Sequence, residues 1–224
     1  MESAKILIVD TYPAIGQSLA FALDKQTSFT TQACTTQDDI PDSVRAFMPD
    51  IIVINVHQAE AQAGLAACRM VAELPGHQMI VLFIPAALMA DAVVMDAIEA
   101  GADGVLCRED TDFSQLVESL GRVQQGHSLL TSQQLRTALA GRRLVSTEQQ
   151  LIDLTPREQE VAELIAKGAS TEDIASQLTI SLRTAYAHIG SILAKLGVSS
   201  RVEAVVRLYQ WRLLGDSSSS NGLT

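Results

Sequence analysis

Polar residues that could do chemistry follow three of the apolar runs in the first half of this chain. Asp10 follows KILIV, Asn55 follows IIVI, and Arg108 follows a run that begins at Gly104. Mg²⁺ prefers several oxygen ligands, usually including carboxylates, so Asp10 beside Thr11 and Asn55 is a poor site for it. Asn55 carries a neutral carboxamide, which is a poor nucleophile. Arg108 could bind a small anion. These groups do not form a catalytic constellation, so we expect that the protein is not an enzyme and that no cofactor or metal is bound.

Alternating strands and helices are expected to position these residues. The apolar runs predict strands at Lys5–Val9, Ile51–Ile54, Met79–Ile84 and from Gly104. Helix-like segments lie at about 14–23, 60–74, 88–100 and 112–125. This alternation, with continuous apolar strands, is typical of a parallel sheet that is covered on both faces. The carboxyl ends of such strands share one edge, where ligands bind, so the polar residues are expected to meet there.

A second pattern covers Leu154 to Ala204, where each of three short amphipathic helices is opened by a capping signal. The signals are Thr155 with Glu158, Ser170 with Asp173, and Ser181. Gly168 and Gly197 are expected to end the first and third helices, because glycine adopts the left-handed conformation cheaply. The third helix is predicted to bury Ala185, Ile189, Ile192, Leu193 and Leu196. A fourth helix is predicted from Arg201 to Leu213. Two short helices joined by a tight connector at Thr179-Ile180 indicate a helix-turn-helix.

These residues resemble the LuxR-type DNA-binding domain of NarL/FixJ response regulators. The matching pieces are Leu154–Glu158, Glu160-Val161, Gly168, Asp173–Ala175, Leu178, Ile180-Ser181, Thr184, His188, Ile192-Leu193, Lys195–Val198 and Ser200–Ala204. The resemblance implies a transcription regulator that binds double-stranded DNA as a homodimer, on half-sites expected to form an inverted repeat. It also implies that the fourth helix pairs with its twin, for which the candidate residues are Val202, Val205, Leu208 and Tyr209. Packing of the same residues on the domain's own core is the alternative.

The candidate DNA contacts lie mainly on the third helix, because a recognition helix enters the major groove with its N-terminal half facing the bases. The predicted set is Thr171, Ser181, Arg183, Thr184, Tyr186, Ala187, His188, Lys195 and Arg201. The Thr-Val-Lys segment common in the family stands here as Thr184-Ala185-Tyr186. Because a tyrosine replaces the lysine that commonly faces the groove, we expect an unusual base preference and a lower affinity.

The first domain resembles a CheY-like receiver, through Pro49–Ile52 and Ala100–Gly104. The resemblance implies a doubly wound parallel sheet of five strands. The phosphoacceptor pocket departs from the pattern: a receiver has two adjacent acids, a phosphorylated aspartate, a Ser or Thr, and a lysine. The corresponding residues here are Asp10, Thr11, Asn55, Ala86 and Arg108. Without these groups we expect no aspartyl phosphorylation. The domain is then a structural shell that serves as a constitutive dimerisation platform, or a sensor in which Arg108 and the strand ends bind a small anion or a partner protein. An alternative function is a protein-interaction regulator with weak or lost DNA binding.

Length and charge fit an α/β domain followed by an all-α domain. The expected division of the 224 residues is 1–125 for the receiver, 126–150 for a linker with a short helix, 151–214 for the DNA-binding domain and 215–224 for a disordered tail. Residues 1–125 hold six Lys and Arg against 17 Asp and Glu, whereas residues 151–213 hold seven of each. Phosphate affinity should therefore be modest and sensitive to salt. The sequence shows no signal peptide and no run long enough to span a membrane, so a cytoplasmic location is expected. Three widely spaced cysteines argue against disulfides and a zinc site, and small buried side chains are the expected role.

Overall fold

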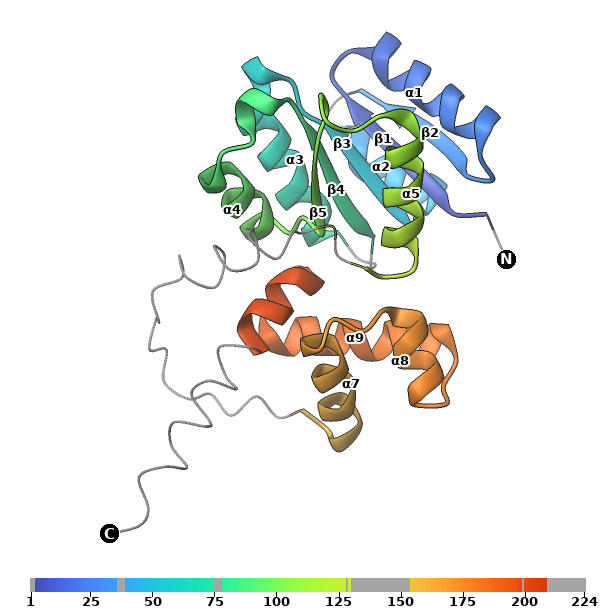
Figure 1. Cartoon of the computed structure of the whole chain (residues 1–224), viewed down its shortest axis with the longest axis vertical. Coiled ribbons are helices and arrows are strands. Elements are labelled where there is room, and N and C mark those ends of the chain that lie inside the picture. Colours follow the sequence, from blue (N-terminus) through green and yellow to red (C-terminus); the bar gives the residue numbers. More distant parts are fainter. Residues whose placement is uncertain are drawn as a thin grey trace.

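The chain forms an α/β domain and a smaller helical domain that lies beside it (Figure 1). The computed structural model describes residues 3–35, 39–74, 78–127, 129, 154–198 and 200–208. The predicted succession of an α/β and an all-α domain is confirmed. The expected short helix in the linker, the tail from residue 215 and Tyr209 lie outside the described residues. Within the part of the chain that is described, no helix has the length and apolar character needed to cross a membrane.

Five parallel strands make the sheet of the first domain, in the order β2-β1-β3-β4-β5. Their bounds are β1 Lys5–Asp10, β2 Thr30–Cys34, β3 Ile51–Asn55, β4 Met79–Ile84 and β5 Gly104–Cys107. β1, β3 and β4 are buried almost throughout, which explains their uninterrupted apolar sequences. The register pairs Asp10 with Asn55, so the carboxyl ends of the two central strands coincide.

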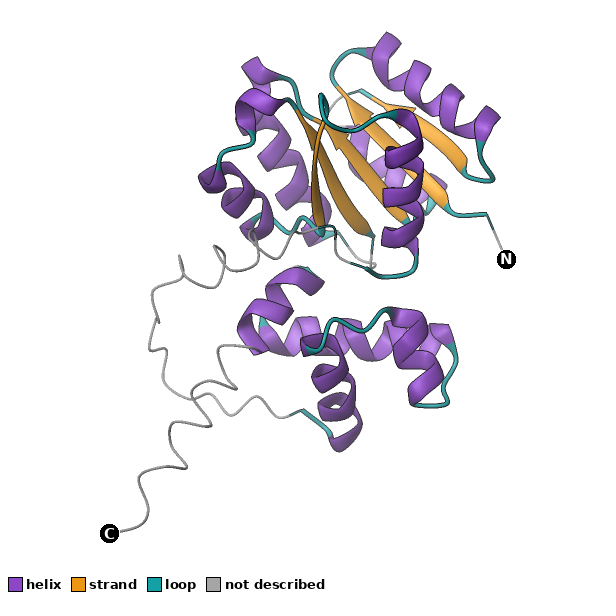
Figure 2. Cartoon of the chain, in the orientation of Figure 1, coloured by secondary structure: helices purple, strands orange, loops and turns teal. Residues whose placement is uncertain are grey.

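Helices cover both faces of this sheet, as Figure 2 shows. The helices and 3₁₀ turns are α1 Pro13–Gln26, α2 Ile40–Phe47, η2 Gln58–Glu60, α3 Ala61–Glu73, η3 Ala86–Leu88, α4 Asp91–Glu99 and α5 Phe113–Gln124. One core cluster joins α2, α3 and α4 to one face of the sheet. A second cluster joins α1 and α5 to the other face. This arrangement confirms the predicted doubly wound domain.

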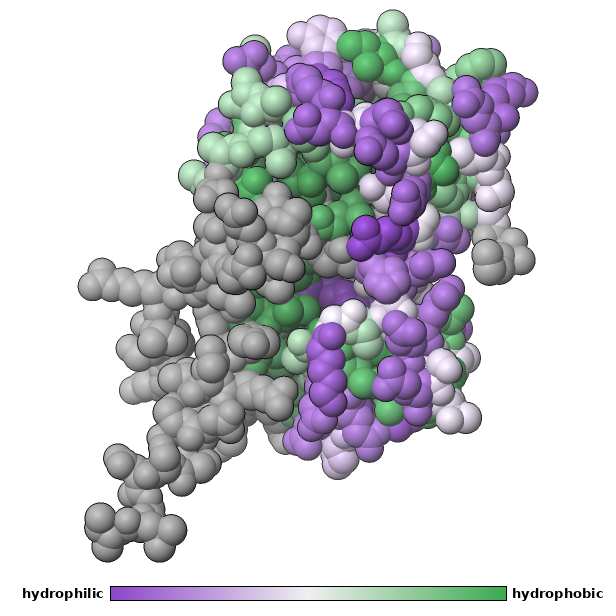
Figure 3. Space-filling model, in the orientation of Figure 1, coloured by the Kyte–Doolittle hydropathy of each residue, from purple (hydrophilic) through white to green (hydrophobic). Residues whose placement is uncertain are grey.

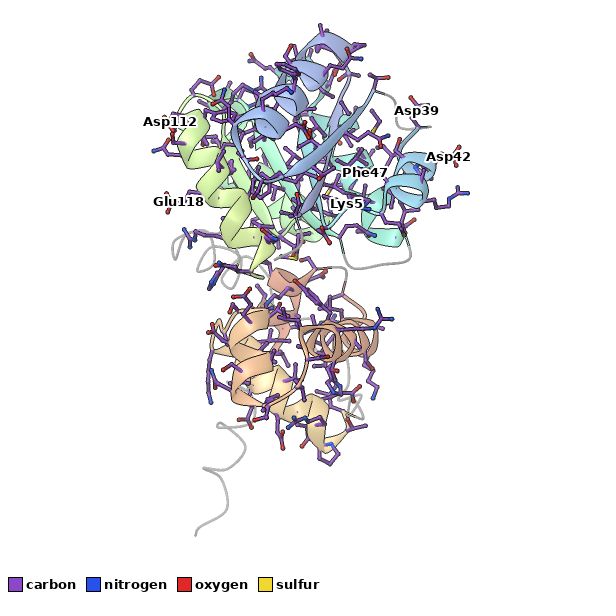
Figure 4. The ribbon with its side chains drawn as sticks, turned by 90° about the vertical axis from the view of Figure 1, so that its right-hand side faces the viewer. Lys5, Asp39, Asp42, Phe47, Asp112 and Glu118 are labelled. Carbon is purple, nitrogen blue, oxygen red and sulfur yellow. The ribbon has the colours of Figure 1, made fainter. Side chains whose placement is uncertain are left out.

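Two elements of the first domain were not predicted from the residue pattern, β2 and α2. β2 reads TTQAC and lies at the edge of the sheet, where only its last residue is buried. An edge strand of this kind needs no continuous apolar run. α2 ends at Met48, which adopts a left-handed conformation with φ 51°. In Figure 4 Lys5 and Phe47 lie close together where β1 meets the end of α2, and the Lys5 Nζ is 5.6 Å from the centre of the Phe47 ring.

The second domain contains α7 Pro156–Ala166, α8 Thr171–Gln177 and α9 Leu182–Leu196, followed by a helical segment at 201–208. Capping boxes open α7 and α8, and the Ser181 hydroxyl accepts from the Thr184 amide at the start of α9. Gly168 and Gly197 have φ values of 77° and 63°, as expected of helix stops. The five α9 residues predicted to be inward are all buried. The capping, stop and core predictions for this domain are therefore confirmed.

Candidate functional site

The strand-end pocket of the first domain holds a continuous chain of hydrogen bonds. Asp10 is 1% exposed, and its carboxylate accepts from the Asn55 side-chain amide at 2.5 Å and from the Tyr12 backbone amide at 2.8 Å. The His57 Nε2 lies 2.9 Å from the same carboxylate, and the His57 ring meets Tyr12 edge-on at 4.4 Å. Both carboxylate oxygens of Asp10 are thus already bound within the protein.

Arg108, the residue after β5, completes this chain of hydrogen bonds. Its guanidinium donates to the side-chain oxygen of Asn55, to the Val56 carbonyl at 2.6 Å and to the Phe83 carbonyl at 3.4 Å. The guanidinium also lies over the Phe83 ring, 5.6 Å from its centre. The buried Nε atom of Arg108 has no hydrogen-bond partner among the described residues. Arg108 therefore stands inside the pocket and turns towards the ends of β3 and β4.

The residues present do not fit the Mg²⁺-dependent phosphoacceptor that a receiver fold implies. Asp10 supplies one carboxylate, which Asn55, Tyr12 and His57 already occupy. The Thr11 hydroxyl donates to Glu60 at 2.5 Å, away from Asp10. Asn55 stands where the register would place the acceptor, and both ends of its carboxamide are hydrogen-bonded. Mg²⁺ prefers several oxygen ligands, and Asp10, the one acid among the five pocket residues, already contacts three groups of the protein.

The fourth pocket position, Ala86, contributes a backbone amide in place of a hydroxyl. This amide donates to the Glu109 carboxylate at 2.6 Å, and the same bond lowers the pKa of Glu109. The structure thus brings together Asp10, Asn55 and Arg108, whereas Thr11 and Ala86 lie exposed at the rim. The polar groups described at the rim and at the centre of the pocket form hydrogen bonds within the protein.

The predicted DNA contacts divide into exposed and enclosed residues. Ser181, Arg183, Thr184 and Ala187 are exposed at the N-terminal half of α9, where a recognition helix meets base edges. His188 is half-buried. Figure 3 shows hydrophilic residues along much of the side of the molecule where α5 and the helices of the second domain lie. The exposed part of α9 is therefore compatible with a DNA-reading role.

Thr171 and Arg201 lie inside the protein, contrary to the exposure that DNA contact requires. Thr171 is 1% exposed and Arg201 is 7% exposed. The Arg201 guanidinium donates to the Thr171 hydroxyl at 3.1 Å and to the Ala169 carbonyl. Burial lowers the pKa of Arg201, although the Asp103 carboxyl opposes the shift. In this arrangement both side chains brace α8 against the last helix and are not available to a phosphate.

Tyr186 and Lys195 are also engaged within the protein. The Tyr186 hydroxyl donates to the Gln124 carbonyl at the end of α5, at 3.3 Å, and burial raises its pKa. The Lys195 ammonium pairs with the Glu158 carboxylate at 2.6 Å. Hydrogen bonds from Lys195, Ser191 and the Thr155 amide lower the pKa of Glu158 to about 2. Lys195 therefore stabilises the packing of α7 on α9, and Tyr186 contacts the receiver.

The candidate pairing residues that the structure describes pack against two different core clusters. Val202 is buried in the core cluster of the receiver, together with Val206. Val205 and Leu208 pack against the core of the second domain instead. The alternative, packing on the domain's own core, agrees with Val205 and Leu208, whereas Val202 packs on the receiver. Tyr209 lies outside the described residues.

Three residues with structural or electrostatic importance were missed by sequence reasoning: His57, Asp103 and Glu158. The sequence pattern predicts only a capping role for Glu158, and His57 lies two positions beyond Asn55 with no spacing that marks it. The pattern around Asp103 indicates only a framing motif, yet its carboxyl is buried where the two domains meet. The three cysteines are buried and free, as expected. Burial raises the pKa of Cys34 to about 11 and that of Cys68 to about 12, so both stay protonated at neutral pH.

A receiver-like α/β domain followed by a capped helix-turn-helix defines a two-domain response regulator. Comparison with known proteins agrees. Residues 153–208 match the family described as "Bacterial regulatory proteins, luxR family". The nitrate/nitrite response regulator protein homolog of Haemophilus influenzae is 30% identical over 213 residues, which cover 93% of this chain and 98% of that protein. The nitrate/nitrite response regulator NarL of Escherichia coli K12 is 28% identical, over 95% of this chain and 98% of its own length.

A solved structure shares the fold at lower identity. The RcsB protein of a structure described as two RcsB dimers bound to two parallel DNAs matches with a TM-score of 0.51 and 15% identity, over 93% of this chain and 98% of that one. The chain belongs to the LuxR-type response regulators, the family that contains these nitrate/nitrite regulators. Its relatives are regulators of transcription and not enzymes, in agreement with the sequence-based expectation.

Proposed function

We propose that this response regulator binds double-stranded DNA as a dimer and acts without phosphorylation of its receiver. The observation that carries the proposal is the hydrogen-bond chain Asp10–Asn55–Arg108. A carboxamide stands at the acceptor position, and its two ends are held by a carboxylate and a guanidinium. The pocket therefore supplies neither a nucleophile nor free oxygen ligands for a metal.

The helix-turn-helix supplies the DNA-binding half of the proposal. Ser181 and Thr184 place hydroxyls at the N-terminus of α9, which suits phosphate contacts, and Arg183 suits a phosphate or a guanine. His188 and Ala187 extend the same surface. We infer that Thr171, Tyr186, Lys195 and Arg201 join this set only if contacts inside the chain are released. The related RcsB is described as dimers on DNA, and two copies here would read an inverted repeat.

Two surfaces are candidates for pairing. One is the predicted set Val202, Val205, Leu208 and Tyr209, of which Val202 is covered by the receiver and Tyr209 lies outside the described residues. On the receiver, α1 exposes Ile15 and Phe21, with 48% and 65% of their surface accessible. Apolar side chains that are this exposed are suited to an interface with a second copy.

Two measurements on the full chain test this function. In a selection on random double-stranded DNA at low salt, followed by gel shift, the protein should enrich one motif with two-fold symmetry. Failure to enrich any sequence contradicts DNA binding. In the second measurement the protein is incubated with a small phosphoryl donor and Mg²⁺, and its intact mass should stay unchanged. An added phosphate contradicts the assignment of Asn55.

A protein-interaction regulator is the second candidate, and the Tyr186 contact favours it. A recognition-helix residue that binds the receiver is not free to read a base. The receiver also holds the chain's excess of acidic residues, which suits a basic partner protein. If the DNA selection fails while the folded chain still recovers one defined partner, this second function replaces the first.

A further inference from the structure

The turn between α8 and α9 contains a strained residue, Thr179. Its φ is 53°, in the left-handed region that a β-branched side chain rarely adopts. The turn of a helix-turn-helix often contains glycine, which takes this conformation at little cost. A strained backbone persists only where the surrounding structure holds it in place. The contacts around Thr179 therefore decide in which direction α9 leaves the turn.

Two backbone hydrogen bonds close the end of α8 around this residue. The Thr179 amide donates to the Ser176 carbonyl at 3.2 Å, and the Ile180 amide donates to the Ala175 carbonyl at 2.9 Å. This pair of bonds is the Schellman arrangement of a helix end. It satisfies the two carbonyls inside α8. The Leu178 carbonyl, which belongs to the peptide directly before Thr179, takes its donor from another helix.

Arg157 supplies this donor from the first turn of α7. Its Nη2 donates to the Leu178 carbonyl at 2.6 Å, and its Nη1 pairs with the Glu160 carboxylate at 2.5 Å. The planar fork of an arginine makes two such bonds in a fixed geometry, and bonds from an ionised donor are stronger than neutral ones. Pro156 and the capping box of Thr155 fix this turn of α7. Figure 1 shows the start of α7 on the side of the second domain that faces away from the receiver.

The bond from Arg157 acts on the start of α9 through one rigid unit. Because the peptide between Leu178 and Thr179 is planar, a donor that holds its oxygen fixes the orientation of the whole plane. Ser181 follows two residues later, and its hydroxyl accepts from the Thr184 amide at 3.1 Å to cap α9. A rotation of the plane before Thr179 would therefore turn the axis of α9 and every side chain of its first turn.

We propose that Arg157 is a positioning residue for the recognition helix. By holding the Leu178 carbonyl it keeps Thr179 in the strained conformation, and it thereby sets the direction in which α9 presents Arg183 to DNA. The consequence at DNA rests on the proposed function, whereas the role of Arg157 in the turn does not. A direct contact with phosphate is the competing role, because 37% of the Arg157 side chain is exposed.

Hydrogen exchange on the full chain without DNA tests the turn. Arg157→Met keeps the apolar stem but removes the donor, so the Thr179 and Ile180 amides should exchange about tenfold faster, as expected for loss of one charged hydrogen bond. Glu160→Gln is the matched control, because it removes the exposed ion pair and leaves the bond to Leu178. Its turn amides should exchange as in the wild-type protein. Unchanged exchange in Arg157→Met overturns the proposal, as does equal acceleration in the control.

A second substitution separates the turn from the general stability of the domain. Thr179→Gly removes the steric cost of the left-handed conformation, so the double variant Arg157→Met/Thr179→Gly should recover protection of the Ile180 amide. The amides of the fully buried Ile165 on α7 and Ile192 on α9 should keep wild-type rates in all variants. Acceleration there as large as in the turn would make Arg157 a general support of the domain, which contradicts the proposal.

DNA binding by the same variants tests the consequence for recognition. The ratio of affinities for selected DNA and for scrambled DNA of equal composition should fall about tenfold in Arg157→Met. The ratio should rise again in the double variant with Thr179→Gly, and a double variant as defective as the single one contradicts the proposal. The dependence of affinity on salt should stay unchanged. A salt slope that falls by about 0.9 with an unchanged ratio makes Arg157 a phosphate contact and overturns its positioning role. If the wild-type protein selects no DNA while the turn amides respond as predicted, the proposed function fails and the role of Arg157 in the turn stands.

Discussion

Asp10 and Asp103 are buried aspartates at opposite ends of the strands of one sheet, and their surroundings differ. Asp10 ends β1 at the carboxyl edge, where Asn55, Tyr12 and His57 bind it within the receiver. Asp103 precedes β5 at the other edge, where part of its cover comes from the second domain. A carboxyl that is satisfied inside one domain can only stabilise that domain. A carboxyl that is covered by a neighbouring domain contributes to how the two domains pack on each other.

We infer from this difference that the two ends of the strands have separate roles. At the carboxyl ends of the strands, the polar residues form a structural hydrogen-bond network that is centred on Arg108. The opposite edge still touches the helices that would read DNA and pair with a second copy.

The largest effect on stability is expected from removal of Arg108, which would break the structural edge. Arg108→Met preserves much of the volume but leaves the Asn55 side chain and the Val56 carbonyl without their donor. We expect the free energy of unfolding in urea to fall by about 2–4 kcal/mol. Arg45→Met is the control, because Arg45 and its partner Asp42 have side chains that are 72% and 82% exposed. This change should cost less than about 0.5 kcal/mol. Equal losses in the two variants would show that the Arg108 network is not structural.

A smaller but specific loss is expected from Arg183, which is exposed at the start of the recognition helix. Arg183→Ala should weaken binding to the selected DNA by about tenfold, as loss of one side-chain contact commonly does. The thermal stability of this variant should equal that of the wild-type protein, because Arg183 is exposed. Fluorescence anisotropy measures the affinity for the selected DNA, and Arg45→Ala is the control variant. An unchanged affinity would remove Arg183 from the interface.

Lys195 should behave in the opposite way, because it is paired with Glu158. Lys195→Met should leave the salt dependence of DNA binding unchanged and lower the stability of the second domain by about 1 kcal/mol. The pKa of Glu158 is lowered to about 2 from 4.5, so its contribution is complete above 4.5 and is lost as pH falls towards 2. Acid titration followed by circular dichroism should show a weaker pH dependence in the variant. A reduced salt slope with unchanged stability would make Lys195 a phosphate contact instead.

The sequence predicted local structure better than contacts between domains. Continuous apolar runs marked β1, β3 and β4, and Ser or Thr followed by an acid marked the starts of α7 and α8. β2 was not predicted, because an edge strand that is half exposed carries no such apolar run. The meeting of Asp10, Asn55 and Arg108 was predictable, because strand ends in a parallel sheet share an edge. The contact of Tyr186 with Gln124 was not, since it joins residues 62 positions apart and depends on how two folded surfaces fit.

The most direct test of control without phosphorylation is DNA binding by the full chain with and without a phosphoryl donor and Mg²⁺. We predict that the affinity for the selected DNA is the same under both conditions, because the Asn55 carboxamide is a poor nucleophile and cannot accept the phosphoryl group. An affinity that changes when the phosphoryl donor is added would contradict control without phosphorylation.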